Sequence, residues 1–101
     1  MVKITLITRN NSFVSFEATG HTGIKGESLV CAAVSAIIKC GANALKDDKY
    51  VYEDKDGYFY LEATGEISEH DAIVIETITT QIECLAESYG EEVRLERKNR
   101  K

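Results

Sequence analysis

The chain has 101 residues, 44% of them hydrophobic and 29% charged, which is enough to bury one core, and we expect a single domain over residues 1–101. Its formal net charge of −5 argues against nucleic-acid binding, which needs a basic surface, and no apolar run approaches the roughly 20 residues of a membrane span. Three cysteines, an odd number, and a first segment of alternating polar and apolar residues instead of a secretory signal predict reduced thiols and a cytoplasmic location.

The first 19 residues predict a β-hairpin. Apolar residues alternate with polar ones over residues 2–6 and again over residues 14–18, which is the period of a half-buried strand. The segment between them, Arg9 to Ser12, contains two asparagines, which favour tight turns.

A helix is expected to begin at Leu29, where the hydrophobic period changes from two to between three and four. Ser28 is a suitable N-cap residue, because its hydroxyl can accept a hydrogen bond from a free amide of the first turn. The apolar stripe of this helix comprises Val30, Val34, Ile37, Gly41 and Leu45.

A second hairpin and a second helix follow. Residues 50–64 contain two aromatic strands around Asp56-Gly57, a dipeptide typical of a two-residue turn with positive φ angles. Ser68 begins a capping-box pattern, and apolar residues recur at helical spacing up to Tyr89. A short strand is expected at residues 93–96, followed by a frayed basic tail at residues 97–101.

The expected order of elements is therefore ββαββαβ. Such an order predicts an α+β fold of two layers, with a mainly antiparallel sheet and two helices on one of its faces.

Cys31 is the first candidate for chemistry, because it falls in the first turn of the predicted helix. At that position the helix dipole and the free amides favour a thiolate, and the same amides can hold an oxyanion. His21 lies ten residues before it in a loop that contains Gly20, Gly23 and Gly26, so the imidazole can reach the thiol. The residues alone leave two simpler interpretations open, a buried core cysteine and a surface histidine.

Other interpretations receive less support. The glycines before a helix allow an anion site, but neither the P-loop nor the dinucleotide-binding spacing is present. Ser35 lies one turn after Cys31 and either supports the site or bonds its own backbone. No spacing of cysteines and histidines supports a metal site, no cofactor is expected, and Cys40 and Cys84 are expected to pack.

The segments Gly20–Gly23 (GHTG) and Val30–Ser35 (VCAAVS) resemble the signature of the ribosomal-processing cysteine proteases, the Prp family. The resemblance extends over the order of elements and the size of the whole chain. It implies a small cytosolic α+β enzyme, a homodimer, that removes an N-terminal extension from the twenty-seventh large-subunit ribosomal protein after an aromatic pair. The implied partner is thus a basic ribosomal protein precursor, with no direct nucleic-acid or membrane contact.

The resemblance also implies roles for individual residues. Cys31 would be the nucleophile and His21 the general base. Two further groups follow from these roles: the supporting or oxyanion-binding residues Leu29, Val30 and Ser35, and the substrate loop with Gly20, Thr22, Gly23 and Gly26. Two features depart from the family pattern, a slightly short loop and Ser28 in place of aspartate. The alternative function is a non-catalytic binding module of ribosome assembly with a buried cysteine.

Overall fold

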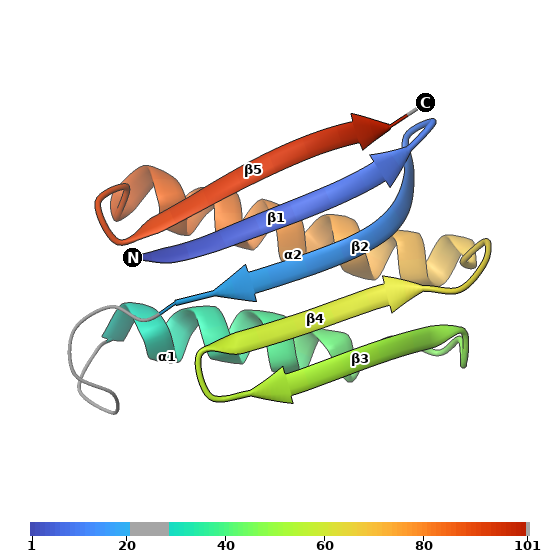
Figure 1. The fold of residues 1–101 in the computed structure, drawn as a ribbon, viewed down its shortest axis with the longest axis horizontal. Coiled ribbons are helices and arrows are strands. Elements are labelled where there is room, and N and C mark those ends of the chain that lie inside the picture. Colours follow the sequence, from blue (N-terminus) through green and yellow to red (C-terminus); the bar gives the residue numbers. More distant parts are fainter. Residues whose placement is uncertain (21–28, 101) are drawn as a thin grey trace.

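The computed structural model describes residues 1–20 and 29–100 and shows five strands in one sheet with helices over one face (Figure 1). The elements, in chain order, are β1 (Val2–Arg9), β2 (Ser12–Thr19), α1 (Leu29–Ser35), the π-helix η1 (Ala36–Cys40), β3 (Tyr50–Lys55), β4 (Tyr58–Ala63), α2 (Glu69–Ser88) and β5 (Val93–Arg100). Since η1 continues directly from α1, the predicted order ββαββαβ and the α+β class are confirmed.

The strands lie in the order β3-β4-β2-β1-β5. The pairs β1–β2, β2–β4 and β3–β4 are antiparallel, and only β5 runs parallel to β1. Asn10 and Asn11 join β1 to β2 with φ angles of 52° and 65°, the left-handed region that asparagine tolerates and a tight hairpin needs. The β3–β4 turn has its positive φ at Gly57 alone, at 76°.

The core lies between the sheet and the helices. Alternate residues of the strands face the helices, as the register requires, and the buried core side chains of the sheet come from β1, β2, β4 and the first residue of β5. The core residues from the strands are Val2, Ile4, Leu6, Phe16, Ala18, Phe59, Leu61 and Val93, and those from the helices are Val30, Val34, Ile38, Ile78 and Ile82. At Gly41 the two helical segments approach so closely that a Cβ atom would lie 2.7 Å from Cγ1 of Ile78.

The structure differs from the sequence-based prediction at the end of the first helix and at the end of the last strand. The first helix does not continue to Leu45: the π-helix ends at Cys40 and residues 41–42 remain helical. The amides of residues 43–45 then donate to the carbonyls three positions back, those of Cys40, Gly41 and Ala42. Residues 97–100, expected to fray, belong to β5 instead, and residue 101 lies outside the described residues. The backbone of β5 pairs with β1 as far as Arg9 and Arg100, and this pairing does not depend on apolar side chains.

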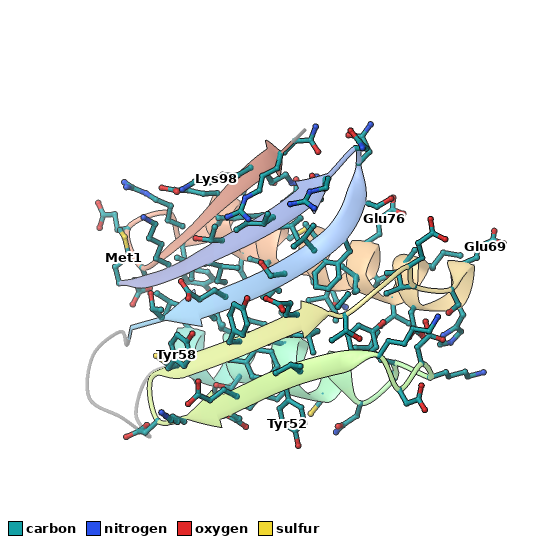
Figure 2. The ribbon with its side chains drawn as sticks, turned by 45° about the vertical axis from the view of Figure 1, so that its right-hand side comes forward. Met1, Tyr52, Tyr58, Glu69, Glu76 and Lys98 are labelled. Carbon is teal, nitrogen blue, oxygen red and sulfur yellow. The ribbon has the colours of Figure 1, made fainter. Side chains whose placement is uncertain are left out.

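The tyrosines of the second hairpin do not form one group. Tyr50 and Tyr52 are paired with Ala63 and Leu61 and share the helix-covered face of the sheet, whereas Tyr58 and Tyr60 alternate with buried residues and face the other side. In Figure 2, Tyr52 projects from the edge strand β3 and Tyr58 stands at the start of β4. Within the described residues, no helix is long and apolar enough to cross a membrane.

Candidate functional site

A pocket of about 430 Å³ lies where β2 ends and α1 begins, and Cys31 lines it. Its floor consists of buried apolar residues of the core, among them Val2, Ala18 and Val34. Its rim is polar and comes from α1–η1 on one side and the β3–β4 turn on the other. The thiol therefore lies at the boundary between the packed interior and a hollow large enough for part of a peptide.

Cys31 is partly buried and packs against the core. It occupies the third position of α1, within the first turn, where backbone amides lack partners inside the helix. Partial exposure at a helix start combines access for a reagent with an environment that favours a thiolate. The interpretation of Cys31 as a fully buried core thiol does not agree with this placement.

Gly20, at the end of β2, has a backbone that other residues could not adopt easily. Its φ angle is 101°, and a Cβ atom added there would lie 2.2 Å from the carbonyl oxygen of Met1. Its amide donates to the carbonyl of Gly57 in the β3–β4 turn at 2.9 Å. Gly20 thus fixes the end of β2 against both the first residue and the turn, and it lines the same pocket as Cys31.

The other predicted site residues fall into three groups. Ser35 is exposed and lines the pocket with Cys31, on the same face of the helix. Leu29 is 86% exposed, whereas Val30 points into the core, so only the backbone amides of these two residues remain as candidates for a role. His21, Thr22, Gly23 and Gly26 lie outside the described residues, as does the predicted N-cap Ser28.

Sequence reasoning missed the rim of the pocket. Lys39, from η1, Asp56, from the β3–β4 turn, and Tyr58, at the start of β4, all line it. The turn was predicted, but its position beside Cys31 follows from the pairing of β2 with β4, in which Thr19 lies opposite Tyr58. No local pattern in the sequence specifies that pairing.

A second polar cluster surrounds Asp71 at the start of α2, at the opposite end of the fold from α1's first turn (Figure 1). Its carboxylate is fully buried and accepts hydrogen bonds from the amides of Lys46 and Asp47, each at 2.9 Å, and from the Tyr50 hydroxyl at 2.8 Å. His70 Nδ1 lies 2.8 Å from the same group. His70 therefore has a specific partner in Asp71.

Asp47 and Asp71 both form hydrogen bonds with Ser68, the N-cap residue of α2. Ser68 caps α2 by accepting from the Asp71 amide at 3.2 Å, as the capping-box pattern predicts. The Ser68 amide is satisfied by Oδ2 of Asp47 at 2.8 Å instead of by Asp71. Burial acts to raise the pKa of Asp71, but the donors around it outweigh burial and hold its pKa well below the usual range.

The prediction that the remaining two cysteines pack in the interior is wrong. Cys40 and Cys84 are both exposed, and all three cysteines are free thiols. Across residues 1–20 and 29–100, no three histidine, cysteine, aspartate or glutamate side chains come together as metal ligands would.

Comparisons with known proteins place the chain in a family. The family model described as cysteine protease Prp matches residues 1–94. A ribosomal processing cysteine protease Prp from Staphylococcus aureus is 26% identical over 83 residues, which cover 75% of this chain and 78% of that relative.

Two solved structures share the fold. A crystal structure of the S. aureus ribosomal processing protease Prp with a covalently linked product peptide has a TM-score of 0.90 at 22% identity, and covers 97% of this chain and 100% of its own. A crystal structure of the same S. aureus protease with a substrate peptide has a TM-score of 0.80 at 20% identity, with the same coverage. At these identities the structures support the architecture, and the match of the family model over residues 1–94 shows that the chain belongs to the Prp family of cysteine proteases.

Proposed function

We propose that the chain is a cysteine endopeptidase that removes the N-terminal extension of a large-subunit ribosomal protein, the twenty-seventh, by means of Cys31 and His21. The single observation that carries this proposal is the placement of Cys31, partly exposed in the first turn of α1 and lining a pocket with an apolar floor. The S. aureus relatives are ribosomal processing proteases, and this supports the class of substrate.

The placement of Gly20 supports the pairing with His21. Gly20 immediately precedes His21 in the chain and lines the pocket that contains Cys31. Its contacts with Met1 and Gly57 hold the end of β2 at this position. A cysteine protease needs a base near its thiol, and no histidine of the described residues lines this pocket.

The proposed reaction has two stages. His21 takes the proton of the Cys31 thiol, and the thiolate attacks the carbonyl carbon of the scissile peptide bond. Backbone amides of the first turn, from Leu29 to Cys31, stabilise the oxyanion, and Ser35 supports the site from the next turn. His21 then gives its proton to the leaving amine, and water, deprotonated by His21, releases the acyl group from Cys31.

Electrostatics favours a basic substrate. The chain carries a formal net charge of −5, so a basic ribosomal protein is attracted over distances of about a Debye length, and the attraction weakens as salt is added. We also propose that the enzyme is cytoplasmic and acts as a homodimer, as the family resemblance implies. The free thiols of all three cysteines are consistent with a reducing compartment.

The direct test is cleavage of the ribosomal protein precursor that carries its extension, followed by intact mass spectrometry. Cys31→Ala is expected to lower the single-turnover rate by at least about a thousandfold, because the covalent route is lost. Cys84→Ala, which removes an exposed thiol on α2, is the matched control and should cleave at the normal rate. Unchanged cleavage by Cys31→Ala would rule out Cys31 as the nucleophile.

A further inference from the structure

A second hollow of about 460 Å³ adjoins the pocket of Cys31. It lies between η1 and the following residues 42–48 on one side and the helix-covered face of β3 and β4 on the other. Lys39 and Phe59 line both hollows. A peptide whose scissile bond lies at Cys31 can therefore extend along the surface from the first hollow into the second.

The walls of this second hollow suit a long side chain with an apolar stem. Leu45 and Tyr50 are partly buried in it, and Tyr52 is 69% exposed. Tyr52 stands on the edge strand, where no further strand of the sheet covers it (Figure 2). The stems of lysine and arginine pack on such apolar surfaces, and their charged ends are attracted to the faces of aromatic rings.

The polar part of the lining is predominantly negative. Asp47, Asp48 and Asp54 contribute carboxylates, against one ammonium, that of Lys39. Lys39 Nζ lies 3.0 Å from Oδ1 of Asp54, so its charge is already balanced. Asp48 is exposed and makes no ion pair or hydrogen bond within the described residues. The lining therefore favours a cation over a neutral or acidic side chain.

We propose that this second hollow binds a lysine or arginine side chain of the same peptide that is cleaved at Cys31. This inference rests on the proposed function and names a specificity site for it. Lys39 follows Cys31 by eight positions, which corresponds to about 12 Å along a helix. An extended peptide covers that length in about four residues, so the basic residue lies about four positions from the scissile bond.

The test uses synthetic fluorogenic peptides that span the scissile bond of the ribosomal precursor. In a parent peptide without charged residues, each position within about six of the bond is replaced in turn by lysine or by glutamine. Lysine about four positions away should lower KM by about threefold to tenfold relative to glutamine, with kcat little changed. Lysine at positions adjacent to the bond should give no such preference.

Variants of the lining should change this preference in opposite directions. Asp48→Asn and Asp54→Asn each remove one negative charge and should reduce the preference for lysine by about threefold. Lys39→Gln removes the positive charge and should increase the preference for lysine. Glu76→Gln, which neutralises an exposed carboxylate on α2, is the matched control and should leave the preference unchanged.

The outcomes separate this inference from the proposed function. Cleavage with no preference for lysine at any position, or a preference that Asp48→Asn and Lys39→Gln leave unchanged, would contradict the basic-residue site while Cys31-dependent proteolysis stands. Failure of the wild-type chain to cleave the full-length precursor would instead contradict the proposed function itself.

Discussion

The two helices of this fold begin in different environments. At α2, Ser68 caps the first turn, and the carboxylate of Asp71 is completely buried among donors from residues 46–50. At α1, the described part of the first turn contains no acidic residue, Leu29 is largely exposed, and Cys31 faces a pocket. The two starts lie at opposite ends of the same layer (Figure 1).

This difference separates stability from chemistry. The start of α2 uses the protein's own groups to satisfy its polar atoms, which fixes residues 46–50 to the helix. The start of α1 leaves a thiol accessible beside a hollow of about 430 Å³, the arrangement that a nucleophile requires. Substitutions at the start of α2 should therefore change the free energy of unfolding, and substitutions at the start of α1 should change the rate of cleavage.

Gly20→Ala should lower both the free energy of unfolding and the cleavage rate, because it disturbs the pocket end of the sheet itself. The added Cβ atom would lie 2.2 Å from a backbone oxygen of Met1, and alanine disfavours a φ of 101°. We expect a loss of about 2–4 kcal/mol in the free energy of unfolding, together with a reduced kcat. Urea denaturation and cleavage assays on the same preparations measure the two effects.

Gly65→Ala is the matched control, since a Cβ atom there has no neighbour within 4 Å. It should change the free energy of unfolding by less than about 0.5 kcal/mol. An equal effect of the two substitutions would show that Gly20 holds no special position.

Asp71→Asn should destabilise the chain by about 2–3 kcal/mol and leave kcat unchanged in the folded enzyme. The variant loses the negative charge of the carboxylate, to which the Lys46 amide and the Tyr50 hydroxyl donate hydrogen bonds. Because the pKa of Asp71 is lowered on folding, its contribution is complete above the ordinary carboxyl pKa and declines as the pH falls toward the lower, folded value. The difference in stability between wild type and variant should therefore narrow below about pH 4.

Chemical denaturation at a series of pH values measures this difference. A gap that stays constant from neutral to strongly acidic pH would contradict a carboxylate stabilised by its neighbours.

Sequence reasoning predicted the local features of both starts but not their surroundings. The change in hydrophobic period placed Cys31 in a first turn and the capping-box pattern placed Ser68 at a cap, because both depend on neighbours along the chain. The donors around Asp71 and the rim residue Asp56 come from distant segments, which only the packing of the sheet brings together. The pairing of residues 97–100 with β1 was missed for the same reason.

Ser35→Ala should have the smallest effect. Its side chain is exposed on the pocket rim one turn beyond Cys31, so its loss should leave stability within about 0.5 kcal/mol of wild type. A supporting role predicts a fall in kcat of a few-fold with little change in KM. An unchanged kcat would remove Ser35 from the site.

The most direct test of an accessible, activated thiol at α1 is the rate of alkylation of Cys31 by iodoacetamide as a function of pH. The measurement uses a chain with Cys40→Ser and Cys84→Ser, so that a single thiol reacts. The account predicts a reaction midpoint clearly below the ordinary thiol pKa of about 8.5, and a shift toward that value in His21→Ala. A wild-type midpoint at or above about 8.5, or no reaction in the folded chain, would contradict it.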